Sequence, residues 1–165
     1  MPEKGIEMSI DLLNYLQEED IILNLKGKSK KNIISTILDH LVERKKINKG
    51  DKKEILKVIL QREDIGSTAI GGYIALPHTR LDCIKDIILC MAISKEGVDF
   101  ESLDQEPVNV IVLLLSNQKE AGIHLKTLAY LAKLLRDKFF VQQLKNVKDK
   151  KEVIPLIAKQ QSALR

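Results

Sequence analysis

The sequence predicts an α/β domain built on a mixed β-sheet with helices on both faces. The first observation is a pair of nearly continuous apolar runs rich in β-branched residues, residues 87–93 (IILCMAI) and 108–115 (VNVIVLLL). Such runs are typical of strands that are covered on both faces. The second observation is that helical apolar patterns precede and follow these runs, which predicts the covering layers.

A single domain is expected over residues 1–165, with a core from about residue 8 to 160. The length of 165 residues and the 44% share of hydrophobic residues suit one domain with a sizeable core. We find no repeat, low-complexity tract or Pro/Gly/Ser-rich linker that would mark a boundary.

The first half of the chain predicts one short strand and two helices. Residues 21–25 form the strand candidate, and Ser29 is placed to cap the helix that follows. Asp51 and Glu54 have the spacing of a capping box, which predicts a second helix to about Arg62. The first helix has apolar residues at helical spacing: Ile33, Ile34, Ile37, Leu38, Leu41 and Val42.

The second half predicts further helices after the two apolar runs. Residues 124–136 are expected to form a helix, and more helix is expected through Phe140 and Leu144. Asp149 and Glu152 resemble another capping box, but Pro155 predicts a kink or a late start there. The apolar stripe expected on the first of these helices consists of Leu125, Leu128, Ala129, Ala132 and Leu135.

Composition argues against several classes of protein. The net charge is only +4, tryptophan is absent and aromatic residues make up 4%, so nucleic-acid binding is not favoured. Cys83 and Cys90 form no CxxC pair, which argues against a disulfide scaffold or a zinc knuckle, and Cys90 is expected in the core. No apolar run approaches the roughly 20 residues of a membrane span, and no secretory signal begins the chain. We therefore expect a soluble, cytoplasmic protein without direct membrane insertion.

Residues 62–80 (REDIGSTAIGGYIALPHTR) carry the chemistry. Gly66, Gly71 and Gly72 allow sharp bends near the hydroxyls of Ser67 and Thr68, so this loop could hold an oxyanion. It is not a nucleotide-binding P-loop, because no Lys-Ser/Thr pair follows the glycines. A GxSxG hydrolase motif is also absent.

His78 is the expected functional centre. Pro77 holds its own φ angle and favours an extended residue before it, so the imidazole sits on a stiff backbone. Imidazole has a reference pKa of about 6.5, which leaves a free ring nitrogen near neutral pH for a phosphoryl group.

The other two histidines differ in their expected roles. His124 would lie in the first turn of a helix, where unpaired N–H groups favour a phosphoryl group, although it could also be an incidental first-turn residue. His40 is expected to be structural. No ligand spacing supports a zinc site from His78, His124 and a cysteine.

Over nearly its whole length the sequence resembles the fructose/mannitol-type enzyme IIA domains of the bacterial phosphoenolpyruvate-dependent phosphotransferase system. The matching motifs are REx₂GSTxIG, IAxPHxR and HLx₂LA, in that order. Ala69 departs from the pattern, since the family usually has glycine there. The stretch 98–110 and the single-domain length resemble most the nitrogen-regulatory subgroup.

The resemblance implies a phosphorelay without a metal or an organic cofactor. A histidine-containing phosphocarrier protein would phosphorylate His78 at Nε2, and the group would pass to a cysteine of an enzyme IIB domain or serve a regulatory target protein. Arg62 and His124 would flank the ring, with support from Ser67, Thr68 and Arg80. The open alternatives are a sugar-transporter component and a binding module that acts by contact alone.

One further expectation concerns the surface around the site. Among Ile70, Tyr73, Ile74 and Leu76, some are expected at a rim where partners dock. Tyr73 is expected to be the most exposed of the four.

Overall fold

The computed structural model describes residues 10–165 and contains one mixed β-sheet. Strand β1 pairs with β4, β4 with β5, and the other edge of β5 pairs first with β2 and then with β3. The β4–β5 pair is antiparallel and the other pairs are parallel, which confirms the mixed sheet. The strands are β1 (Ile21–Ile22), β2 (Ile74–Ala75), β3 (His78–Leu81), β4 (Ile88–Val98) and β5 (Val108–Asn117).

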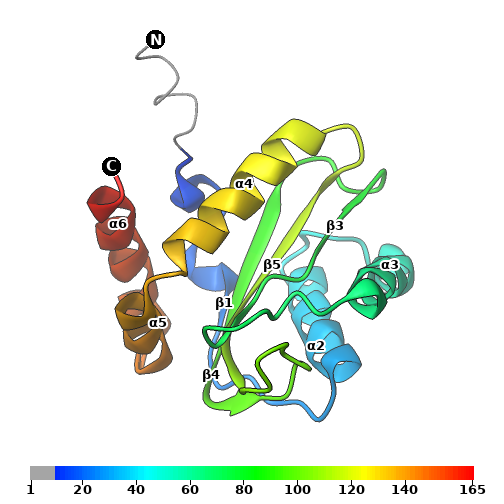
Figure 1. Ribbon diagram of the computed structural model, residues 1–165. Coiled ribbons are helices and arrows are strands. Elements are labelled where there is room, and N and C mark those ends of the chain that lie inside the picture. The colour runs from blue at the N-terminus through cyan, green and yellow to red at the C-terminus, as the bar shows by residue number, and fades with distance from the viewer. Residues whose placement is uncertain (1–9) are drawn as a thin grey trace.

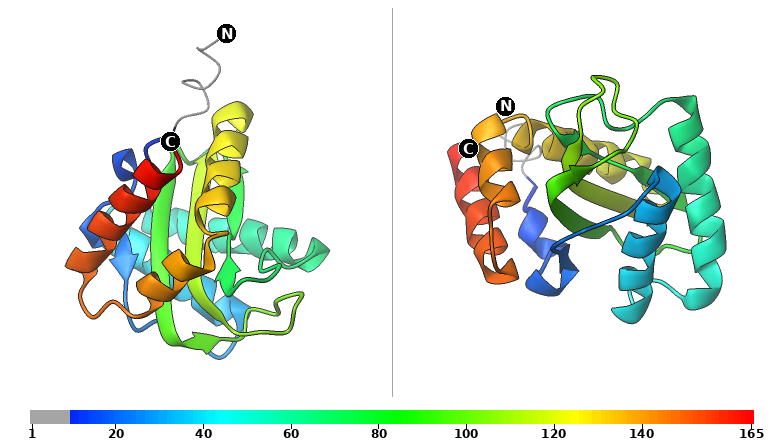
Figure 2. Two further views of the ribbon diagram at one scale, coloured as in Figure 1. Left: turned by 60° about the vertical axis from the view of Figure 1, so that its left-hand side comes forward. Right: turned by 90° about the horizontal axis from the view of Figure 1, so that it is seen from below.

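Helices cover both faces of this sheet, as predicted (Figure 1). One face carries α2 (Lys30–Glu43) and α3 (Lys52–Ile65), while the other carries α4 (Ala121–Leu134), α5 (Lys138–Lys145) and α6 (Val153–Ala163). Figure 2 shows the two layers separately when the molecule is seen from below. Short 3₁₀ helices are η1 (Leu12–Asn14), η2 (Glu18–Asp20), η3 (Lys49–Asp51) and η4 (Lys150–Glu152).

Alternation along the central strands divides the core in two. In β4, Cys90 faces the cluster with α2 and α3, whereas Leu89 and Met91 face the cluster on the other side. In β5, Leu113 and Leu114 alternate in the same way. Burial on both faces explains why both runs read as continuous apolar sequence.

Of the three predicted helix N-terminal caps, the structure confirms two and contradicts one. The Ser29 hydroxyl accepts the N–H of Asn32 at 3.1 Å and caps α2 as expected. The Asp51 capping box is wrong: this residue ends η3, has helical backbone angles, and its side chain caps no N–H of α3. Asp149 does form its capping box, at η4, and α6 begins late with Pro155 in its first turn, where no N–H partner is needed.

Helix α4 is rotated relative to the predicted stripe. It begins at Ala121 and buries His124, Thr127, Leu131 and Leu134. Leu125 is 64% exposed, because the helix directs a histidine and a threonine toward the sheet. Of the five residues of the predicted stripe, Leu125 and Ala129 are exposed, Leu128 and Ala132 are half-buried, and Leu135 is buried, so the prediction of the buried face was wrong over most of the helix.

No helix within residues 10–165 is long and apolar enough to cross a membrane.

Candidate active site

His78 is held by backbone on two sides. It opens β3, where the neighbouring Pro77 carbonyl accepts the Leu114 N–H of β5 at 3.0 Å. Its Nδ1 lies 2.7 Å from the Leu76 carbonyl oxygen. Because a carbonyl oxygen only accepts, Nδ1 carries the proton, and in the neutral ring the lone pair is on Nε2.

His124 lies beside this ring, with the two ring centroids 5.5 Å apart and the planes inclined at 53°. Its N–H is donated to Glu120 O at 3.0 Å, so the expectation of an unpaired backbone N–H at this residue was wrong. The helix starts three residues earlier than predicted, and His124 contributes its side chain instead. The ring Nδ1 lies 2.5 Å from the buried Ser116 hydroxyl.

Burial keeps the His124 ring neutral. The residue is 4% exposed, and burial, with smaller contributions from the charges of His78 and Arg80, lowers its pKa to about 4. A neutral imidazole has one donor and one acceptor nitrogen. At neutral pH His124 is thus a hydrogen-bonding group and not a fixed cation.

Two arginines supply the positive charge. Arg62, in the last turn of α3, donates from Nη1 to Gly66 O at 2.8 Å. Arg80 of β3 donates from Nη1 to Gln118 O at 2.7 Å. Each guanidinium keeps further N–H groups beyond the bond described, because arginine carries five donors.

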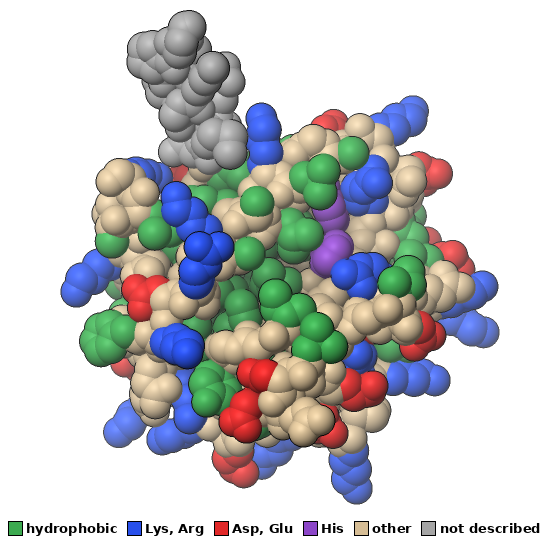
Figure 3. Space-filling model, viewed as in Figure 1, with side chains coloured by type: hydrophobic (Ala, Val, Ile, Leu, Met, Phe, Trp, Pro, Cys, Tyr) green, Lys and Arg blue, Asp and Glu red, His purple; other side chains and the backbone are tan. Residues whose placement is uncertain are grey.

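The two histidines, His78 and His124, and the two arginines, Arg62 and Arg80, line one cavity of about 380 Å³. Figure 3 shows the adjacent pair of histidines at the surface, with basic and hydrophobic side chains beside it. One part of the lining is polar and basic, and α4 adds an apolar part. The full lining is Arg62, His78, Thr79, Arg80, Gln118, Ala121, His124, Leu125 and Leu128.

Ser67 and Thr68 lie outside this lining. The Ser67 hydroxyl donates to Phe100 O at 3.1 Å, and the Thr68 hydroxyl donates to the Glu63 carboxylate, which also accepts the Thr68 N–H at 3.0 Å. The loop does hold an oxyanion, but it is the carboxylate of the protein's own Glu63. The structure therefore gives these hydroxyls a role in loop geometry and does not bring them to the His78 cavity.

The glycine turn after this loop is tight. Gly71 and Gly72 have φ angles of +138° and +73°, which favour glycine. Ile70 is 71% exposed and Tyr73 is 40% exposed, so the expectation that Tyr73 is the more exposed was wrong. Ala69 is fully buried without a positive φ, so its backbone conformation does not require glycine.

The remaining candidates lie apart from the site. Cys90 is buried in the core as expected, and burial raises the pKa of its thiol to about 12. His40 bonds Glu19 O through Nε2 at 2.7 Å and joins α2 to η2, which confirms a structural role. Within the described part of the chain, no group of three His, Cys, Asp or Glu residues could hold a metal ion.

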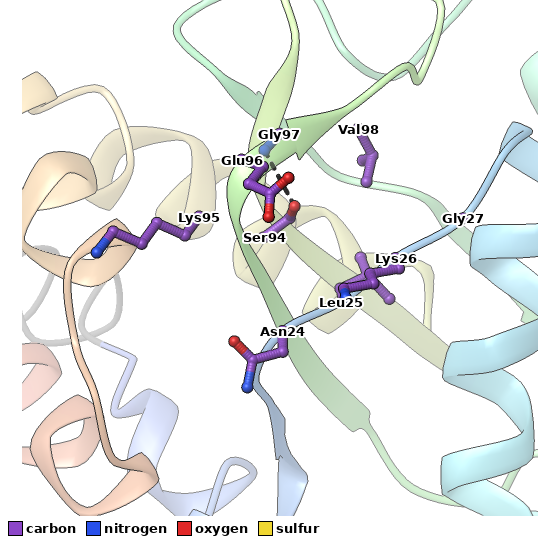
Figure 4. A pocket seen from close by; sticks show the side chains of 9 residues that line it. All are labelled: Asn24, Leu25, Lys26, Gly27, Ser94, Lys95, Glu96, Gly97 and Val98. Carbon is purple, nitrogen blue, oxygen red and sulfur yellow. Dashed lines mark hydrogen bonds between the residues drawn. The ribbon is translucent and has the colours of Figure 1, made fainter.

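A second cavity, of about 270 Å³, lies toward the other end of the sheet (Figure 4). It is lined by residues 24–27 and 94–98, with no histidine or arginine among them. The Ser94 hydroxyl there accepts the Gly97 N–H at 3.0 Å. The chemistry-bearing side chains therefore gather at the His78 cavity.

Sequence reasoning missed four residues around the site. Ser116 contacts His124, the Gln118 carbonyl holds Arg80, and Lys30 pairs with Glu63 at 3.0 Å. Ser116 had a visible signal, since it is a polar residue at the end of an apolar strand. The other contacts join residues distant in sequence or use backbone atoms, which local patterns do not reveal.

The fold and this site define a known class of phosphotransferase components. Residues 14–160 match the family described as phosphoenolpyruvate-dependent sugar phosphotransferase system, EIIA 2. The chain therefore belongs to that family.

Similar proteins carry both regulatory and transport names. A nitrogen regulatory protein of Bradyrhizobium diazoefficiens is 33% identical over 89% of this chain and 94% of its own length. The fructose-specific EIIABC component of Bacillus subtilis is 31% identical over 88% of this chain but only 23% of its own length. The structure of nitrogen regulatory protein IIA-Ntr from Neisseria meningitidis has a TM-score of 0.80 at 26% identity, over 89% of this chain and 99% of that one.

Proposed function

We propose that His78 accepts a phosphoryl group on Nε2 and relays it between partner proteins. The observation that carries this proposal is the bond from Nδ1 to the Leu76 carbonyl, because it leaves Nε2 as the nucleophilic nitrogen of the neutral ring. In the transfer, a P–N bond forms at Nε2 while the bond between phosphorus and the donor breaks, and the donor keeps that electron pair.

The surrounding side chains fit a phosphoryl transition state. Transfer of this kind is loose and in line, with charge spread over three equatorial oxygens, so the protein mainly positions and neutralises. Arg62 and Arg80 provide guanidinium groups at the cavity. When the Ser116 hydroxyl donates to Nδ1 of His124, the proton of that neutral ring is on Nε2, available to a phosphoryl oxygen.

The donor that we propose is a histidine-containing phosphocarrier protein. Leu125 of the cavity lining and Ile65 at the end of α3 are exposed apolar side chains that could contact such a partner. The acceptor that we propose is a cysteine of an enzyme IIB domain. A mannitol enzyme IIA from Escherichia coli was solved in complex with phosphorylated enzyme IIB, and its fold matches this chain at a TM-score of 0.74 and 22% identity, over 87% of this chain and 97% of that one.

A regulatory role is the second part of the proposal, in which phosphorylation changes the protein that this face binds. Support comes from the nitrogen regulatory relative, which this chain matches over nearly its full length. A phosphoryl group adds about −1.5 to −2 charges and would discourage partners fitted to the bare apolar face. A component of a fructose transporter is the alternative, supported by the fructose-specific relative.

Phosphorylation from phosphoenolpyruvate tests the relay. The purified protein is incubated with phosphoenolpyruvate and the two general phosphotransferase proteins, and intact mass is measured before and after acid treatment. We expect one acid-labile phosphoryl group in the wild type and in His40→Gln, and none in His78→Ala. Labelling that persists in His78→Ala would refute His78 as the phosphoryl acceptor. A wild-type protein that stays unlabelled would favour the binding module that acts by contact alone.

A second experiment separates regulation from transport. Unmodified and phosphorylated protein are used in parallel pull-downs from cell extract, and label transfer to purified IIB domains is followed. A regulator should retain different partners in its two forms. The same partners in both forms, with rapid transfer to a IIB cysteine, would support the transporter alternative instead.

A further inference from the structure

Two buried opposite charges lie outside the His78 cavity. Lys30 is the first residue of α2 and is 8% exposed, and Glu63 lies in the last turn of α3 and is 4% exposed. The Lys30 Nζ is 3.0 Å from Glu63 Oε1 and 5.2 Å from the centre of the Phe100 ring. Replacing a buried ion pair by apolar residues is often neutral or stabilising, so stability alone is a weak explanation for this one.

Hydrogen bonds, linked through the backbone of Thr68 and Leu76, connect this pair to the His78 ring. Both the N–H and the hydroxyl of Thr68 are donated to the Glu63 carboxylate. The Thr68 carbonyl accepts the Leu76 N–H at 3.3 Å, and the carbonyl of the same Leu76 accepts Nδ1–H of His78 at 2.7 Å. The position of the Leu76 carbonyl therefore depends on a backbone segment that the Glu63 carboxylate holds through Thr68.

The carboxylate is suited to this task because it accepts bonds from three different groups. It accepts one bond from an ammonium group, one from a backbone N–H and one from a hydroxyl. Fully satisfied polar networks in a buried environment fix one arrangement of their members. The Lys30 ammonium group is bound to the Glu63 carboxylate and so holds that carboxylate in position.

We propose that Lys30 and Glu63 are a positioning pair for the phosphoryl site, which acts through Thr68 and the Leu76 peptide to hold His78 with its proton on Nδ1 and its lone pair on Nε2. The proposal rests on His78 as the phosphoryl acceptor. The tautomer of His78 can be measured without any phosphoryl transfer. An experiment that refutes the positioning role of Lys30 and Glu63 can therefore be distinguished from one that refutes the relay.

The test compares Lys30→Met and Glu63→Gln with a matched control, Lys52→Met. Lys52 and Asp39 form an ion pair at 2.5 Å between the same two helices, but the pair is more exposed and has no bond to the Glu63 network. Lys30→Arg keeps the positive charge and serves as the conservative variant. Each protein is first checked for native secondary structure by circular dichroism.

The tautomer is read from ¹⁵N chemical shifts of the His78 ring at about pH 9, above the ordinary imidazole pKa of about 6.5. We expect the Nδ1–H form alone in the wild type, Lys52→Met and Lys30→Arg, and a mixture of both tautomers in Lys30→Met and Glu63→Gln. In transfer assays with the phosphocarrier protein, the last two should lose about tenfold in kcat with an unchanged KM, because misplacement of a reacting group costs rate and not docking.

If a single variant does not fold because one charge remains unpaired, the double variant Lys30→Met/Glu63→Gln removes both charges. A glutamine oxygen there can still accept from Thr68 N–H, but the ammonium no longer fixes it, and we expect mixed tautomers again. A wild-type tautomer and wild-type kcat in the folded variants would overturn the proposal. A mixed tautomer with no phosphorylation of any protein would support the pair and refute the relay.

Discussion

His124 should make the stability of the protein depend on pH in a window above that of the carboxyl groups. Burial, the first cause, and the charges of His78 and Arg80 lower the pKa of His124 to about 4 in the folded state, against an ordinary value of 6.5. Between these values the unfolded state binds the extra proton and the folded state does not. The free energy of unfolding is therefore undiminished above about pH 6.5 and falls as the pH drops toward about 4.

The size of this effect follows from the two pKa values. A difference of 2.5 (6.5 minus 4) at about 1.4 kcal/mol for each pKa unit gives a loss of up to about 3 kcal/mol. That is a large share of the roughly 5 to 15 kcal/mol that stabilises an ordinary domain.

The measurement is urea unfolding of the wild type and of His124→Gln at several pH values from about 8 to 4. The chain has no tryptophan, so far-UV circular dichroism is the suitable signal. The carboxyl groups of Asp11, Asp104 and Asp137 also have a lowered pKa, but they act on both proteins and cancel in the comparison. Equal pH dependence in the two proteins would refute the reasoning about His124.

The remaining predictions concern rate, capping and packing. Arg62→Ala should fold normally but transfer phosphoryl about 10²- to 10³-fold more slowly in a stopped transfer assay, and a wild-type rate would make Arg62 structural. Ser29→Ala should lose about 1 kcal/mol of unfolding free energy while Asp51→Ala loses much less, because only Ser29 caps a helix; equal losses would contradict this. Phe100→Ala should lose about 3 to 5 kcal/mol in urea unfolding, since this ring is fully buried, and a loss below about 1 kcal/mol would show that the core refills the space.

The layered fold was predictable because its central strands are buried on both faces. The runs in β4 and β5 have no polar face, so they required helices on both sides. The rotation of α4 was not predictable in the same way. Its sequence is apolar around much of its circumference, and the face that packs on the sheet includes His124, which contacts Ser116 on a different element.

His78, His124, Arg62 and Arg80, which the family resemblance grouped at one site, line a single cavity in the structure. The sequence pattern did not distinguish residues that line the cavity from residues, such as Ser67 and Thr68, that shape the loop before His78. The hydroxyl of Thr68 could have faced an incoming phosphoryl group or a carboxylate of the protein, and both choices have the same local sequence. The outcome depended on Glu63, which is buried and pairs with Lys30, 33 residues away.

Strand β5 holds both rings of the site, since Leu114 bonds the backbone next to His78 and Ser116 bonds His124. These two anchors are two residues apart, about 7 Å along a strand, in the most buried part of the sheet. The spacing between the His78 and His124 rings is therefore a property of strand register and does not depend on a flexible loop. In the proposed relay, a docking partner would meet a geometry that is already set, and the adjustment needed to bring phosphorus in line would come from the partner and from the arginine side chains.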